Sequence, residues 1–157
     1  MTLLDGIAVV GMIAALIALP FCFYYFRRAP IRSALCLGIP LLIVGGAAST
    51  SQDLAHHEVL QKLNSLSDAS NVTINGQPAL DSKQVLTALK ALAWIPPHHS
   101  NPTKRIGIEI ADPSSPILLN LARDSGDPRE YWVYYPKYYL TRYNEIGKIR
   151  TSLLDEY

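Results

Sequence analysis

The sequence predicts two transmembrane helices in a hairpin followed by a small α+β domain, an antiparallel meander of about four to five strands with one packed helix. Three observations predict this fold class. Two uncharged apolar runs lie in the first third of the chain, an amphipathic helix pattern lies near its middle, and short alternating runs between turn signals follow. The length of 157 residues is typical of one domain with appendages.

The first apolar run covers residues 7–26 and contains no charged side chain. Its length matches the roughly 20 helical residues that cross a hydrocarbon core of about 30 Å. Aromatic side chains gather at its far end, between Phe21 and Phe26, and arginine follows at once. Because membrane–water interfaces favour aromatic rings and arginine, this run is predicted to be a transmembrane helix rather than a buried core helix.

The second apolar run, residues 34–48, is shorter, and small polar residues at its ends extend it to a span over residues 33–50. Pro40 interrupts it, which membrane helices tolerate better than helices in water. The linker between the runs, residues 27–32, is short and requires a direct return of the chain. The runs are therefore predicted to form an antiparallel hairpin that contacts the lipid bilayer through residues 7–50.

The basic residues near the spans predict the orientation. Arg27, Arg28 and Arg32 lie in the linker, whereas no Lys or Arg precedes the first run and none follows the second run before Lys62. The positive-inside rule then places the linker in the cytoplasm and both chain ends outside. We expect a multi-pass protein of the cell inner, or plasma, membrane. Its C-terminal domain is expected to be extracytoplasmic, which means periplasmic in a bacterium.

A rival interpretation makes the second run a secretory signal. Residues 27–51 contain a basic start, an apolar stretch and small residues around Ala47 and Ala48, the order of a cleavable signal. Cleavage there would release a soluble domain. The first run argues against cleavage because a signal begins near the N-terminus, so two retained spans are the favoured prediction. Cys22 and Cys36 fall inside the spans and are expected to pack as small apolar residues.

The remaining sequence starts with a helical pattern. Apolar residues from Leu54 to Leu66 recur at steps of three and four, so a helical stalk and linker over residues 51–70 is expected to continue the second span. The extracytoplasmic α+β domain then covers residues 71–157. It opens with a hairpin around Asn75 and Gly76, a dipeptide that suits a two-residue turn.

A helix is predicted over residues 82–93, because Asp81 and Gln84 have the spacing of a capping box and an apolar stripe follows. Antiparallel strands are predicted after this helix, over residues 106–110, 117–123 and 130–135, with residues 138–143 as a further strand. Residues 144–150 fit either a turn and a strand or a short helix. Turn residues separate these segments.

Composition and motifs point away from several functions. The net charge is +1, so there is no electrostatic basis for a nucleic-acid partner. No phosphate loop, dinucleotide fingerprint or hydrolase elbow occurs, so no cofactor, no catalytic residue and no enzymatic activity are predicted. The histidines form two pairs, His56-His57 and His98-His99. Neighbours on a helix point about 100° apart, so a metal site is not predicted.

Aromatic residues gather between residues 131 and 143, and this is the most distinctive local pattern. Trp132 and Tyr134 share one face of the predicted strand, and Tyr and Trp are enriched in binding hot spots. The candidate protein-binding residues are these two together with Arg123, Arg129 and Tyr138. The alternative is a sheet packed on both faces, by the helix on one side and by the stalk on the other.

The leading functional hypothesis is a membrane-anchored extracytoplasmic protein-interaction module, in one concrete form an immunity-type or inhibitor protein that acts at the membrane. Its motivation is an anchor, a small domain, an aromatic strand and the lack of a catalytic motif. The alternative is an accessory subunit of a membrane complex that is held through the hairpin. A metal-binding or catalytic domain that uses the histidine pairs is a third hypothesis.

Overall fold

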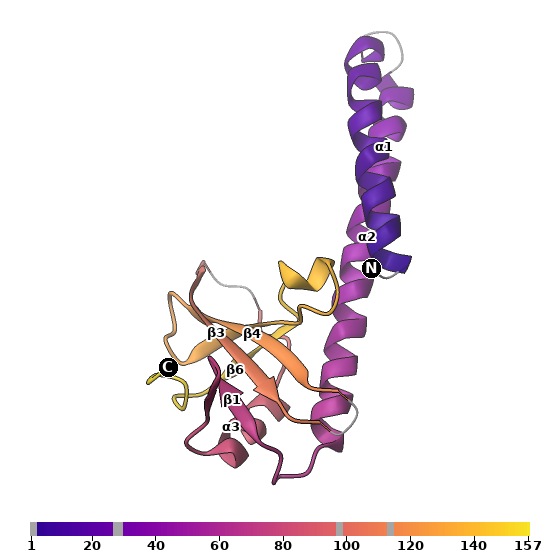
Figure 1. Ribbon diagram of the computed structural model, residues 1–157. Coiled ribbons are helices and arrows are strands. Elements are labelled where there is room, and N and C mark those ends of the chain that lie inside the picture. Colours follow the sequence, from indigo (N-terminus) through magenta and orange to yellow (C-terminus); the bar gives the residue numbers. More distant parts are fainter. Residues whose placement is uncertain (1–2, 27–29, 97–98, 113–114) are drawn as a thin grey trace. The chain divides into compact units, whose positions relative to one another are not determined.

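The computed structural model describes residues 3–26, 30–96, 99–112 and 115–157 (Figure 1). Contacts between residues divide the chain into two compact units. The helical unit comprises Met1–Ser51 with Tyr138–Leu140, and the globular unit comprises Gln52–Lys137 with Thr141–Tyr157. The first unit contains both apolar runs, and the second contains the β-sheet.

Two long helices, α1 (Leu3–Tyr25) and α2 (Pro30–Ser65), contain the apolar runs (Figure 1). By length and composition, both are long and apolar enough to cross a membrane. Most of their large apolar side chains lie on the outside of the helical unit. Leu16 of α1 is 68% exposed and Leu42 of α2 is 76% exposed.

The second half of α2 is part of the globular unit rather than a stalk that stands apart from it. Its side chains of Ala55, Val59 and Leu63 are fully buried. Residues spaced four apart lie on one face of a helix, so these three form a continuous apolar stripe. The predicted stalk therefore supplies one side of the hydrophobic core.

The globular unit contains an antiparallel sheet of six strands in the order β2-β1-β3-β4-β5-β6. The strands are β1 (Val72–Ile74), β2 (Gln77–Pro78), β3 (Pro102–Ile110), β4 (Ile117–Asp124), β5 (Glu130–Tyr134) and β6 (Gly147–Arg150). The predicted α+β arrangement with one packed helix is confirmed. The predicted number of four to five strands is wrong, because β2 and β6 are short pieces that depend on pairing with a longer neighbour.

The predicted strand over residues 138–143 is also wrong. This segment contains a 3-10 helix, η1 (Leu140–Arg142). The hydroxyl of Thr141 donates to the carbonyl of Tyr135 at 2.6 Å, and the Tyr135 amide donates to the carbonyl of Thr141 at 3.2 Å. These two bonds turn the chain after β5. Residues 144–150, which fitted two alternatives, form a turn and the strand β6.

The hairpin between β1 and β2 follows the prediction from the Asn-Gly dipeptide. Asn75 has a φ of 51° and Gly76 a φ of 79°. Two consecutive positive φ angles are the requirement of a type I′ turn, which asparagine and glycine meet at low cost. Thr73 then pairs with Pro78, which leaves β2 only two residues long.

Helix α3 (Ser82–Lys90) begins at the predicted cap. The Gln84 amide donates to one carboxylate oxygen of Asp81 at 2.9 Å, and the Gln84 side chain donates to the other at 2.8 Å. The helix ends before the predicted residue 93 because Ala93 forms a bridge to Lys148 of β6 instead. Their amides and carbonyls exchange two hydrogen bonds, of 3.0 and 2.9 Å.

The core lies on one face of the sheet, which we call the inner face. Ile106, Ile108 and Ile110 of β3 are buried there, and α3 contacts both β1 and β6 across it (Figure 1). Side chains of a strand alternate between faces. Arg105 and Glu109 therefore lie on the opposite, outer face, where both are exposed.

Candidate functional site

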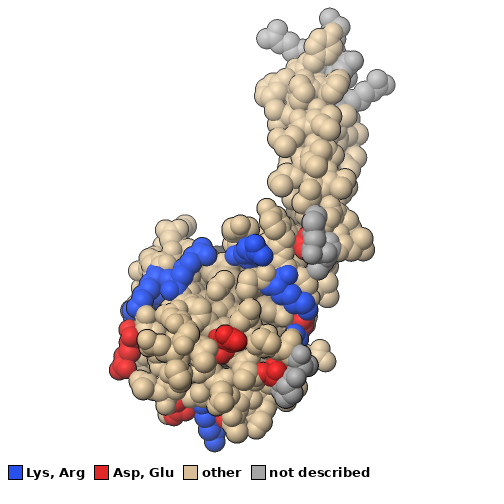
Figure 2. Space-filling model, in the orientation of Figure 1, with Lys and Arg blue, Asp and Glu red and all other residues tan. Residues whose placement is uncertain are grey.

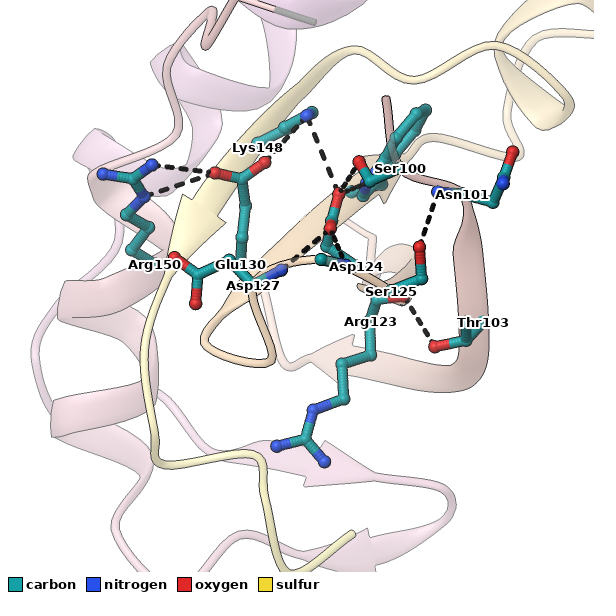
Figure 3. Close-up of polar contacts among 12 residues, drawn as sticks. Ser100, Asn101, Thr103, Arg123, Asp124, Ser125, Asp127, Glu130, Lys148 and Arg150 are labelled. Atoms are coloured by element: carbon teal, nitrogen blue, oxygen red, sulfur yellow. Dashed lines mark hydrogen bonds and ion pairs between the residues drawn. The ribbon is translucent and has the colours of Figure 1, made fainter. Parts of the chain in front are cut away.

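A cluster of charged side chains lies on the outer face where β4, β5 and β6 meet (Figure 3). The register places Trp132 beside Lys148 and Glu130 beside Arg150. Lys148 donates to Glu130 at 2.7 Å, lies 4.0 Å from Asp124, and stands 4.5 Å from the centre of the Trp132 ring. Arg150 reaches the second oxygen of Glu130 at 3.1 Å. The cluster thus joins three strands through paired charges.

Three of the charged side chains in this cluster are buried, so each of them needs a partner of opposite charge. The side chains of Asp124 and Glu130 are fully buried, and that of Lys148 is 3% exposed. A buried charge is tolerated only when opposite charges and hydrogen bonds compensate its lost hydration. Two carboxylates face one buried ammonium group and one exposed guanidinium group, so the formal charges cancel.

Asp124 is the most heavily hydrogen-bonded member of the cluster. It accepts bonds from the Ser100 hydroxyl at 2.6 Å, the Trp132 indole at 2.7 Å, and the amides of Gly126 and Asp127 at 2.7 and 3.1 Å (Figure 3). Burial alone would raise the pKa of Asp124, but these four donors outweigh it and hold the pKa well below its ordinary value. Asp124 therefore stays ionised and is suited to fixing the β4–β5 hairpin, not to accepting a proton in catalysis.

Two of the predicted binding residues lie next to this cluster. Trp132 is half-buried, with its indole N–H held by Asp124. Tyr134 is buried beneath the guanidinium of Arg105, which stands 5.6 Å from the ring centre. Burial, and then the charge of Glu145, raises the pKa of Tyr134. The aromatic strand consequently presents less of its surface than its sequence indicates.

The arginines of the predicted hairpin tip point to different partners. Arg123 donates to Asp155 at 2.6 Å and to the carbonyl of Pro128 at 2.7 Å. Arg129 is exposed and lies 3.6 Å from Asp127. The two arginines lie in one hairpin, but their guanidinium groups serve different contacts.

The other predicted residues lie in the helical unit or outside the described residues. Tyr138 belongs to the helical unit, in which the neighbouring Leu140 amide donates to Asp5 at 3.4 Å. Arg27 and Arg28, which carried the prediction of orientation, lie outside the described residues, and the side chain of Arg32 is likewise not described.

The first histidine pair has a structural environment. His56 is buried, donates from Nδ1 to the carbonyl of Ile146 at 2.6 Å and stacks on Trp94 with ring centres 5.1 Å apart. In the second pair, His98 lies outside the described residues and His99 is exposed. Among the described residues, no group of three or more His, Cys, Asp and Glu side chains is arranged to hold a metal ion.

Two hollows at the sheet surface were not predicted from the sequence. A hollow of about 250 Å³ lies over Gly107, with Thr73, Glu109 and Asn120 at its sides. A second hollow, of about 410 Å³, is lined by Lys62, Ser115, Pro116, Tyr135 and Lys137. Leu118 and Pro136 line both hollows. Gly107, set between two inward isoleucines, is the one sequence signal of this opening.

The second hollow contains a shared carboxylate. One oxygen of Glu58 receives Lys137 at 2.6 Å, the Tyr135 hydroxyl at 3.2 Å and Lys62 at 3.3 Å. Burial opposes the charge of Lys62, but Tyr135 and Glu58 outweigh it and raise the pKa of Lys62. Lys62 therefore stays cationic beside the Glu58 carboxylate, which Lys137 also contacts.

Comparisons with protein-family models, with curated proteins and with solved structures find no match for the chain.

Proposed function

We propose that the chain is a membrane-anchored protein-interaction module. The anchor is formed by α1 and α2. Support comes from their many outward apolar side chains, because soluble monomers rarely expose a continuous apolar patch larger than a few hundred Å². Transfer of this apolar surface from water into hydrocarbon is favourable by a free energy of about 25 cal/mol for each Å².

The orientation proposed for this anchor has the arginine-rich linker in the cytoplasm and the globular unit outside, which means the periplasm if the source is bacterial. Reporter fusions after Ser51 and at Tyr157 test it, together with the mass of the mature chain. We expect both fusions to report an outside location and the mass to match the full chain. An inside C-terminus contradicts the orientation, and a mass reduced to the globular unit contradicts the retained anchor.

The globular unit is proposed to bind a partner protein, as an immunity-type or inhibitor protein would. The observation that carries this proposal is the part of the outer face around Leu118, which is 49% exposed between two hollows. The buried charges of Asp124, Glu130 and Lys148 hold the strands of this face in a fixed register. Rigid surfaces lose little conformational freedom on binding, which favours a recognition role.

Chemical cross-linking in cells that make the full chain, followed by purification, tests this role. We expect a defined protein partner that is recovered with the wild type and lost with Leu118→Glu. The matched control is Leu80→Glu, because Leu80 is also highly exposed but does not line either hollow. Recovery of no protein, or equal recovery with Leu118→Glu, contradicts the proposal.

The alternative proposal is an accessory subunit of a membrane complex. It is favoured by the surface of α2 at Gly38, Gly45 and Gly46, where an added Cβ would meet no atom of the described residues within 4 Å. Small residues allow close packing of another transmembrane helix. Replacement of both spans by an unrelated hairpin separates the alternatives, because an accessory subunit loses its function and an interaction module keeps it.

A further inference from the structure

The two hollows share Leu118 and Pro136 in their linings, so they adjoin and make up one stretch of surface. We call it the outer-face groove. It contains three kinds of surface in order: polar side chains around Gly107, an apolar centre at Leu118 and Pro136, and a pair of lysines. An extended peptide can complement all three kinds of surface, with its backbone amides, its apolar side chains and its charged side chains.

The polar end is open to a peptide backbone. Among the described residues, a Cβ added to Gly107 would meet only the side-chain oxygen of Asn75, at 3.8 Å, so no described atom crowds the surface above Gly107. The half-buried side chains of Asn120 and Thr73 stand beside it and form no hydrogen bond to any part of the chain that the structure describes. A carboxamide offers one acceptor and two donors, which complement the N–H and C=O of a peptide bond.

The two ends of the groove differ in charge. Glu109 is exposed at the polar end and has no ion pair with any described residue. At the other end, two ammonium groups, of Lys62 and Lys137, lie beside the carboxylate of Glu58. Figure 2 shows basic side chains along one band of the globular unit, with acidic side chains at its ends and elsewhere on the same face.

We infer that the outer-face groove binds an extended segment of the partner protein. The segment has a basic residue against Glu109, an apolar residue at Leu118 and Pro136, and an acidic residue against Lys62 and Lys137. This inference rests on the proposed interaction function and adds the chemistry of the bound segment. Asn120 binds the backbone, which every segment has. The charges at the two ends therefore decide which segment binds.

Peptide binding to the full chain in phosphatidylcholine nanodiscs tests the charge pattern. Four libraries of fluorescent, capped peptides have a central leucine and end residues that are basic and acidic, both acidic, both basic, or both neutral. Fluorescence anisotropy gives the affinity of each library. We expect the wild type to favour the basic–acidic library by about tenfold over the others, in keeping with about 1.4 kcal/mol per factor of ten.

Single charge reversals must change this preference in opposite directions. Lys137→Glu is expected to favour the doubly basic library, and Glu109→Lys the doubly acidic library. Asn120→Ala is expected to weaken all four libraries alike. Lys83→Glu, on the exposed side of α3, is the matched control and leaves the preference unchanged. Tryptophan fluorescence verifies that each variant is folded. A preference that ignores both reversals overturns the inference.

Photo-cross-linking in cells separates a failure of this inference from a failure of the proposed function. Benzoylphenylalanine is placed at Leu118 in the groove or at Leu80 outside it. Protein adducts from Leu118, lost with Lys137→Glu, support the groove. Protein adducts from Leu80 alone keep the interaction function and overturn the groove, and so do lipid or glycan adducts at Leu118 alongside protein adducts at Leu80. The lack of a protein adduct at either position contradicts both.

Discussion

The helical unit and the globular unit use the same apolar residues in opposite ways. Leucines of α1 and α2 point outward, whereas Leu119 and Leu121 of β4 are fully buried. Polar groups follow the reverse rule, since the globular unit places charges on its outside except for the cluster around Lys148. Amino-acid composition alone therefore does not predict whether a leucine side chain is buried or exposed. The fold of the unit that contains a leucine decides whether its side chain is removed from water.

The largest effect is expected from the exception to this rule, the buried charge of Lys148. Lys148→Met leaves Asp124 and Glu130 buried without their shared cation, which is expected to reduce the free energy of unfolding by about 3–5 kcal/mol. Urea unfolding of the full chain in micelles, followed by tryptophan fluorescence, measures it. Both tryptophans, Trp94 and Trp132, belong to the globular unit.

Lys83→Met is the matched control because Lys83 is exposed on α3, and we expect a change below about 0.5 kcal/mol. A cost of less than about 1 kcal/mol for Lys148→Met would show that the cluster does not hold the sheet together.

A set of three leucines sharpens the comparison between the units. Leu119→Ala removes a core side chain and is expected to cost about 2–5 kcal/mol. Leu118→Ala, on the outer face, and Leu42→Ala, on the outside of α2, are each expected to cost less than about 1 kcal/mol in the same assay. Equal effects of Leu119→Ala and Leu42→Ala would break the contrast between inward and outward leucines.

A smaller effect is expected from acid. The pKa of Asp124 in the folded chain lies well below that of an unfolded aspartate, near 3.9. Between these values the unfolded chain binds more protons, so the contribution of Asp124 is complete above about pH 5 and declines as the pH falls toward the folded pKa. We expect a loss on the order of 1–3 kcal/mol over this range.

Asp124→Asn, examined by urea unfolding at several pH values, isolates this contribution. The variant is expected to be less stable near neutral pH and to lose less stability on acidification than the wild type. Asp53→Asn, on an exposed position of α2, is the control and keeps the wild-type dependence. An unchanged acid dependence in Asp124→Asn would show that other carboxylates govern it.

Local patterns in the sequence predicted much of the fold. The turn at Asn75 and Gly76, the cap at Asp81 and the central strands each depend on neighbours in sequence, and each lies where it was expected. The failures depend on distant partners. The Thr141–Tyr135 hydrogen bonds turn a tyrosine-rich segment that alternation alone would make a strand, and pairing with β5 determines β6.

The candidate site was harder to predict for the same reason. Trp132 was found from its residue type, but its environment depends on Asp124, Lys148 and Ser100, which come from three other segments. The outer-face groove required the strand order, because Thr73 and Asn120 become neighbours only through β3. The spacing of residues along the chain predicts neither the environment of Trp132 nor the outer-face groove.

The bridge between Ala93 and Lys148 has a consequence for self-association. It occupies the backbone of β6 on the side away from β5, and the opposite border of the sheet is a two-residue strand that ends in proline. A sheet with such borders gives another chain little backbone on which to add a strand. Concentrated samples are therefore expected to resist growth of fibrils, and any higher-order species will form through the helices instead.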